Sequence, residues 1–216
     1  MTTNTRKENP MEKTKFFTTQ NLVKIALLSA VATILFQFKI KLPIFPSFLD
    51  IDISDVSIIV GMITITPAAG FIIAILKNLL AGIIFGSATG YVGEFANIII
   101  SSAYILPLAI CLRSRRDLKS ICTAVILGIV SMAVTGGFMN YFIMIPLYAR
   151  VFGMSVADIV GMGTSIYSGI TDLFTLIIYS IIPFNIFKGT IIATVSVIFL
   201  KSIYPALKML RPKSIG

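Results

Sequence analysis

Long apolar runs with brief interruptions cover most of the chain after residue 18, and this feature most limits how the chain can fold. Apolar residues make up 56% of the 216 residues, charged residues only 12%, and the mean hydropathy is +0.96. Soluble proteins average roughly 45–50% apolar and about 25% charged residues. A helix of about 20 apolar residues crosses the roughly 30 Å hydrocarbon core of a bilayer. The sequence therefore predicts an all-α integral membrane protein.

Six apolar segments predict six transmembrane helices in one bundle. They cover residues 19–38, two runs within 55–85, then 91–112, 120–145 and 183–207. Because 31 residues are few for two crossings, the second and third helices are expected to be short or incompletely spanning. The glycines and two acids of residues 146–184 favour an external loop with an interfacial or re-entrant helix. Pro183 is expected to help begin the last crossing.

The basic residues predict the orientation of the bundle. Thirteen of the eighteen lie within residues 6–24, 113–119 and 201–213, beside apolar segments, where they mark the cytoplasmic side. Both termini are therefore expected in the cytoplasm, residues 1–18 as a disordered leader and residues 19–211 as a single domain. The net charge of +9 is explained by this topology and does not require a nucleic-acid partner.

Polar side chains inside these apolar segments are the strongest indication of a site, since ionisable groups near hydrocarbon are costly and usually face a cavity. Glu94 and Asn97 share one helix face, and Asn185 and Lys188 repeat that spacing. The predicted topology gathers the unusual polar groups at the outer end of the bundle: Lys77, Asn78, Glu94, Asn97, Asn140, Asn185 and Lys188.

Structural roles for the same residues stay open. Lys77 and Glu94 could form a salt bridge, and Asn78 and Asn97 could join helices by hydrogen bonds. Lys188 could extend to the outer interface of the membrane. Tyr91 and Tyr141 could belong to the aromatic belt that many membrane proteins carry at the water interface.

Residues 39–54 predict a structured external loop after the first helix. Pro43 and Pro46 interrupt the helical pattern, and acidic residues follow at positions 50, 52 and 55. Phe45, Phe48 and Leu49 are unusually apolar for a solvated loop, which suggests that the segment folds over something. The alternative is an ordinary external turn with acidic side chains.

Catalysis, metal binding and ATP hydrolysis by this chain are poorly supported. Histidine is absent, which removes the commonest metal ligand and acid–base group. No phosphate-binding G-x-x-x-x-G-K-[ST] sequence occurs, so an energy source for uphill transport would have to be supplied by another subunit. We therefore expect a binding protein without a cofactor or metal, and not an enzyme.

The first helix carries a stripe of small residues, Ala26, Ser29 and Ala30. Such stripes let a second helix approach closely, either within the same bundle or from a partner subunit.

Five pieces of sequence, taken together, resemble a known family. They are the proline- and acid-containing loop after the first helix, KNLL, GEFAN, NYFIMIPLYA and PFNIFKG, in this order within residues 20–210. In this respect the chain resembles the riboflavin-specific substrate-binding subunits of energy-coupling factor (ECF) transporters, which are multi-pass proteins of prokaryotic cell membranes.

The resemblance implies a six-helix subunit that binds riboflavin with high affinity at its outer end. Uptake would be driven by a module of two ATPases and a coupling membrane subunit, which docks on Ala26, Ser29 and Ala30. Asn185 and Lys188, with Asn140 and Tyr141 nearby, would address the flavin ring. Glu94, Asn97, Lys77 and Asn78 would serve the ribityl chain or brace the pocket. Phe48, Leu49 and Asp50 would belong to a lid.

Other functions stay open at this point. Flavin mononucleotide (FMN) is a second candidate ligand, and a related subunit could take another vitamin or ring-bearing precursor. A self-sufficient secondary carrier usually shows internal repeats and a midplane ion site, and neither is evident here. An intramembrane enzyme is disfavoured by the missing histidine.

Overall fold

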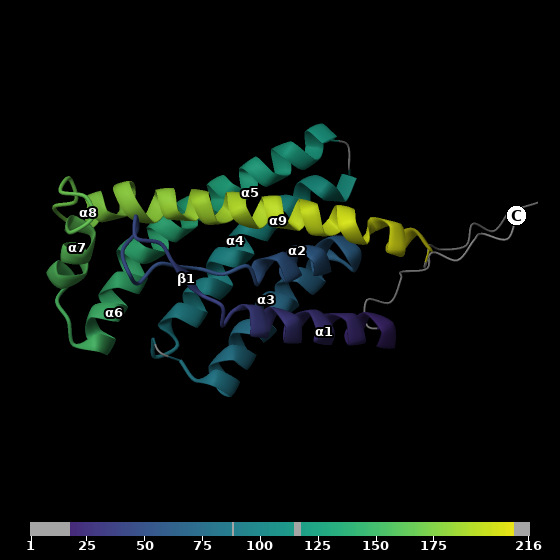
Figure 1. The fold of residues 1–216 in the computed structure, drawn as a ribbon, viewed down its shortest axis with the longest axis horizontal. Helices are drawn as coiled ribbons and strands as arrows, with labels where there is room; N and C mark the ends of the chain where they lie inside the picture. Colours follow the sequence, from purple (N-terminus) through teal and green to yellow (C-terminus); the bar gives the residue numbers. More distant parts are fainter. Residues whose placement is uncertain (1–17, 88, 115–117, 210–216) are drawn as a thin grey trace, which may run out of the picture.

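The structure is a computed structural model that describes residues 18–87, 89–114 and 118–209. All but the last residue of the expected leader, and the expected domain end at residue 211, lie outside the described residues. The described chain is almost entirely helical (Figure 1).

The elements, in order, are the following. They are α1 (Thr19–Leu35), β1 (Ile40–Lys41), β2 (Asp50–Ile51), α2 (Asp55–Thr64), α3 (Pro67–Phe85), α4 (Val92–Ser114), α5 (Leu118–Met139), the π-helical turn η1 (Asn140–Met144), α6 (Ile145–Phe152), α7 (Val156–Thr164), α8 (Leu173–Leu176), the π-helical turn η2 (Ile177–Ile181) and α9 (Ile182–Met209). Figure 1 shows α6, α7 and α8 gathered at one end of the bundle.

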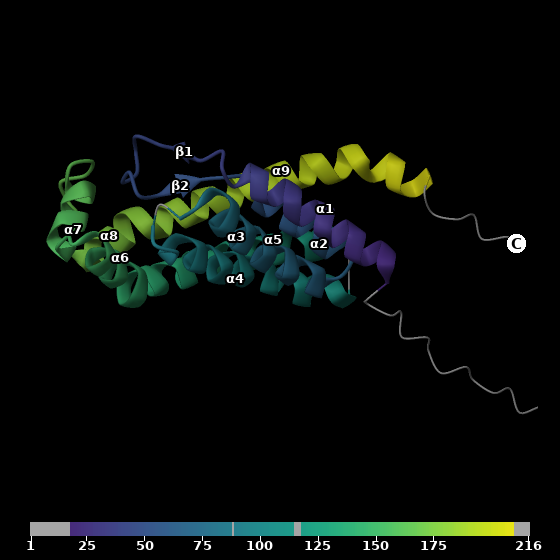
Figure 2. The ribbon, with the colours of Figure 1, turned by 90° about the horizontal axis from the view of Figure 1, so that it is seen from below.

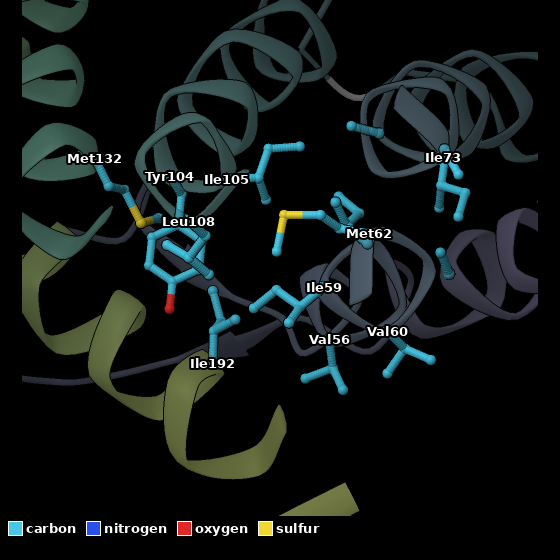
Figure 3. Close-up of a cluster of buried hydrophobic side chains, with 14 of the residues drawn as sticks. Val56, Ile59, Val60, Met62, Ile73, Tyr104, Ile105, Leu108, Met132 and Ile192 are labelled. Carbon is cyan, nitrogen blue, oxygen red and sulfur yellow. The ribbon is translucent and has the colours of Figure 1, made fainter. Parts of the chain in front are cut away.

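The short helix α2 is the centre of the bundle. Every residue from Asp55 to Met62 is buried, because α1, α3, α4 and α9 surround the helix. Figure 3 shows Ile59 and Met62 of α2 facing Ile105 of α4, with Ile192 of α9 beside them. A ten-residue helix is too short to cross a bilayer, so its polar ends must be covered by neighbouring elements.

Four helices among the described residues are long and apolar enough to cross a membrane. They are Pro67–Phe85, Val92–Leu112, Lys119–Phe152 and Leu173–Ser202, while α1 and α2 are shorter apolar helices. Large apolar side chains stand exposed on the outer faces of these helices, among them Ile83, Ile110 and Ile126. Such a surface fits contact with lipid. The expectation of a short second helix is confirmed, whereas α3, with 19 residues, is long enough to span.

The segment between α1 and α2 is structured, as the sequence predicted. Its strands β1 and β2 form an antiparallel pair that joins Ile40 to Ile51 (Figure 2). Leu49 and Ile51 are buried, and the ring of Phe45 meets that of Phe184 on α9 edge-on, with centroids 5.3 Å apart. The loop is therefore held against the end of the bundle.

The prediction that residues 146–184 form an external loop was wrong. The helix that begins with α5 continues through η1 and α6 to Phe152, and the last long helix already begins at Leu173. Only α7 and its two connections lie between these helices. α7 begins with a capping box of Ser155 and Asp158, and Asp172 caps α8 in the same way.

Prolines were expected to mark helix ends, and two π-helical turns explain why they do not. Proline lacks an N–H and collides with the carbonyl four residues earlier, so it normally breaks a helix. Directly before Pro146, the Ile145 N–H donates to the Asn140 carbonyl, five residues back. Directly before Pro183, the Ile182 N–H reaches the Ile177 carbonyl in the same way. These wider turns let both helices continue.

A close contact between α4 and α5 leads to a test of this packing. A Cβ atom at Gly128 would lie 2.4 Å from the Leu108 side chain and 2.9 Å from the Tyr104 carbonyl oxygen. Because the backbone oxygen cannot move away easily, Gly128→Ala should destabilise the protein by about 1–3 kcal/mol. The measurement is thermal unfolding in detergent.

Gly161→Ala on α7 is the matched control, since a Cβ at Gly161 would meet nothing within 4 Å. This control should leave stability unchanged or raise it by up to about 1 kcal/mol. Equal unfolding temperatures for the two variants would contradict the tight contact at Gly128.

Candidate functional site

A cavity of about 130 Å³ lies between the loop that follows α1 and the bundle. Apolar and aromatic side chains form much of its wall, and charged groups and amides are set among them. The lining residues are Phe36, Lys39, Phe48, Leu49, Asp50, Asp52, Asp55, Thr89, Gly93, Glu94, Ala96, Asn97, Ile100, Ser101, Met132, Asn140, Tyr148, Phe184, Asn185 and Lys188. This mixture is typical of sites for small organic ligands.

An ion pair closes one side of the cavity. The Lys188 ammonium on α9 donates to Oδ2 of Asp52 in the loop at 2.9 Å, and both side chains are buried. Burial alone would raise the pKa of the Asp52 carboxyl. The charges of Lys188 and Lys77 and the Ser54 hydroxyl outweigh this effect and hold that pKa below its usual range. Asp52 is therefore ionised at neutral pH, and its charge holds the loop to α9.

A second buried ion pair lies behind the cavity wall. The Lys77 ammonium on α3 is paired with the carboxylate of Asp55 and donates to the Ser54 hydroxyl at 2.6 Å. The Ser101 hydroxyl on α4 donates to Oδ1 of the same Asp55 at 3.0 Å. These contacts join the ends of α2, α3 and α4, and they satisfy charges that would be costly to bury alone.

Two asparagines on neighbouring long helices stand on the cavity wall. Asn140 and Asn185 each donate from their amide nitrogens to the carbonyl four residues earlier, at 2.7 and 2.8 Å. A Cβ atom at Gly136 would lie only 2.7 Å from Nδ2 of Asn185. The absence of a side chain at Gly136 is therefore what lets the Asn185 amide lie against α5.

Glu94 is fixed by the turn between α3 and α4. Its Oε2 accepts from the hydroxyls of Ser87 and Thr89 at 2.8 and 3.1 Å. Tyr91 has a φ of 66°, which is unusual for a residue with a side chain, and its N–H donates to Ser87 Oγ at 2.8 Å. This turn places the Glu94 carboxylate on the cavity wall.

Comparisons with known proteins decide the family. The family described as "ECF transporter, substrate-specific component" matches residues 20–200. This chain belongs to that family.

Individual relatives agree. The chain is 32% identical to "Riboflavin transporter RibU" of Staphylococcus aureus (strain TCH60), over 88% of this chain and 93% of that protein. It is 31% identical to "Riboflavin transporter FmnP" of Bacillus subtilis (strain 168), over 84% of this chain and 91% of that protein. A solved structure described as "Structure and mechanism of the S component of a bacterial ECF transporter" matches with a TM-score of 0.69 and 32% identity, covering 88% of this chain and 98% of that chain. The protein thus has the fold of a substrate-binding (S) component of a membrane transporter, and it is not an enzyme.

The S component's cavity gathers most of the residues that the sequence singled out. Those on its lining are Phe48, Leu49, Asp50, Glu94, Asn97, Asn140, Asn185 and Lys188. Lys188 does not extend to a lipid interface, because its side chain is buried and paired.

Three of the predicted site residues do not line the cavity. Lys77 and Asn78 are buried behind it, and Tyr141 points outward with 36% of its surface exposed. The alternative pairing of Lys77 with Glu94 was wrong, since Lys77 is paired with Asp55. The alternative hydrogen bond between Asn78 and Asn97 is present at 3.5 Å, a long distance for such a bond.

The sequence missed several lining residues, notably Asp52, Asp55, Phe36 and Tyr148. The alternating acids of the loop were a signal for Asp52. Its partner Lys188 lies 136 positions away, and spacing along the chain gives no indication of such a contact.

The small-residue stripe of α1 is split by the fold. Ala26 and Ala30 lie on the exposed side, whereas Ser29 is only 1% exposed and faces the bundle. Ser29 therefore packs within the chain, and only the two alanines stay available for a partner.

The ion pair between Asp52 and Lys188 gives a second test. Asp52→Asn or Lys188→Met leaves one buried charge without its partner and should each lower stability by about 2–5 kcal/mol. The double variant Asp52→Asn/Lys188→Met removes both charges and should lose less than the sum. Thermal unfolding of all four proteins in detergent gives the coupling energy. Strictly additive effects would mean that the two groups do not interact.

Proposed function

We propose that this S component binds riboflavin in the cavity between the α1–α2 loop and the bundle, and delivers it for uptake across the membrane. The observation that carries the proposal is the placement of Lys188, Asn185 and Asn140 on one cavity wall. It is supported by 31–32% identity to relatives that are named riboflavin transporters.

The chemistry of the wall suits a flat ring with polar edges and a hydroxylated tail. Ammonium and amide groups can donate to the carbonyl oxygens of the flavin ring. The carboxylates of Glu94 and Asp50 can accept from ribityl hydroxyls, and buried Oδ1 of Asp50 has no hydrogen-bond partner among the described residues. Aromatic side chains such as Phe184 and Tyr148 offer apolar contact to the ring.

Binding requires the cavity to enlarge. Its volume of about 130 Å³ is smaller than the roughly 300–1,000 Å³ of most ligand sites. The loop that carries Phe48, Leu49 and Asp50 is the part of the wall held by one ion pair and by side-chain packing. We infer that this loop opens to admit riboflavin and closes over it.

The proposal includes the arrangement in the membrane. The six segments α1, α2, α3, α4, α5–α6 and α8–α9 would form one transmembrane domain with both termini in the cytoplasm. A coupling membrane subunit and two ATPase subunits would supply energy, since this sequence carries no phosphate-binding loop of its own. Ala26 and Ala30 would be the contact for the coupling subunit.

Riboflavin binding is directly testable, because the vitamin is yellow and fluorescent and the protein contains no tryptophan. Purified protein should quench riboflavin fluorescence on binding. Lys188→Ala should weaken binding by roughly 10- to 100-fold, which corresponds to one charged hydrogen bond of about 1.5–3 kcal/mol. The control is Thr190→Ala on the exposed side of α9.

The outcomes separate the alternatives. Protein that stays colourless and fails to quench riboflavin would contradict the proposal. Stronger competition by another ring-bearing vitamin would assign the site to that ligand, and competition by FMN measures how far a phosphate is tolerated. Uptake by vesicles without any ATPase subunit would indicate a secondary carrier.

Docking of the coupling subunit is tested by filling the small-residue surface of α1. Ala30→Trp should leave riboflavin affinity unchanged and abolish uptake in cells, because a large side chain prevents close helix approach. Ile126→Trp on the exposed face of α5 is the control for a large apolar addition. Normal uptake by the Ala30 variant would mean that the partner docks elsewhere.

A further inference from the structure

Lys77 is the one lysine on α3, and its side chain is completely buried although it does not line the cavity. Its ammonium lies 5.2 Å from the centre of the Phe36 ring, and Phe36 separates it from other surroundings at the cavity wall. A buried ammonium is costly, so its position calls for a role that a neutral side chain would not fill.

A directional chain of hydrogen bonds connects this lysine to the cavity. The Lys77 ammonium donates to the Ser54 hydroxyl at 2.6 Å. Ser54 in turn donates from its hydroxyl, and at 3.1 Å from its backbone N–H, to Oδ1 of Asp52. The other oxygen of Asp52 accepts from Lys188 at 2.9 Å. Two ammonium groups thus act on one loop carboxylate from opposite sides.

The charges of this chain balance only as a set. Lys77 and Lys188 supply two positive charges, and Asp52 and Asp55 supply two negative ones. When the Lys188 ammonium leaves Asp52 for a ligand oxygen, Asp52 stays buried with the two Ser54 donors, and Lys77 stands directly behind the Ser54 hydroxyl. Riboflavin is neutral, so it brings no charge that could replace the lost partner.

We propose that Lys77 is a positioning residue for the ligand site: it supplies the counter-charge that keeps Asp52 and its loop in place when Lys188 turns to the ligand. The proposal rests on the assignment of Lys188 to riboflavin binding given above. In it, Lys77 does not touch the ligand and acts through Ser54 and Asp52.

The proposal predicts a specific pH dependence. Without Lys77, the bound state would hold two buried carboxylates with no cation paired to them. Lowering the pH protonates one carboxylate and removes the imbalance, so affinity should recover as the pH falls. The described charged groups near this set are Lys188 on α9, Lys77 on α3, Asp55 on α2 and Asp50 in the loop, with Glu94 and Lys39 on the same cavity wall.

The experiment measures riboflavin affinity by fluorescence quenching from about pH 5 to pH 8. Lys77→Met should bind at least about tenfold more weakly than wild type at neutral pH and regain affinity as the pH falls, while wild type changes little. Lys77→Met/Asp55→Asn restores the charge balance and should regain affinity at neutral pH. Lys201→Met, an exposed lysine on α9, is the control and should match wild type.

Unchanged affinity in Lys77→Met, or a loss that neither low pH nor the second substitution reverses, would overturn the proposal. If Lys77→Met does not fold, Ser54→Ala decides, because it removes the bridging hydroxyl and keeps both lysines. Ser54→Ala should weaken riboflavin binding several-fold, and unchanged affinity would overturn the proposal. Failure of wild type itself to bind riboflavin would instead count against the proposed function.

Discussion

The pairing of buried charges is the constraint on which the rest of this structure depends. Two lysines and two aspartates lie where water is largely excluded, and each charge is tolerated only because a partner neutralises it. The pairs involve α2, α3 and α9 and the loop after α1. The same contacts that make these charges tolerable therefore also place the loop over the cavity and fix the cavity's wall.

Most of the helices could be predicted from the sequence, because each long apolar run must satisfy its backbone hydrogen bonds internally. The error lay at residues 146–184, where Pro146 and Pro183 were taken as helix boundaries. Two π-helical turns accommodate them, and both helices continue toward the same end of the bundle. Such a turn leaves no pattern in the apolar residues, so periodicity alone does not reveal it.

The polar residues of the site were predictable individually, and their partners were not. Asn185, Lys188 and Glu94 were found because polar groups inside apolar segments are rare. Lys77 was found for the same reason, but its partner is Asp55, and the cavity wall passes in front of it. Which acid meets which lysine depends on how α2 sits inside the bundle, and this follows from packing between distant segments.

The distance along the chain between Asp52 and Lys188 has a consequence for biogenesis. Lys188 belongs to the last long helix, so during synthesis the loop carboxylate meets this cation only after nearly the whole polypeptide has been made. Lys77, in contrast, follows Asp52 by 25 positions and is available early. The earlier lysine can therefore shelter the acid while the ribosome completes the remaining segments, and arrival of the final helix completes the vestibule.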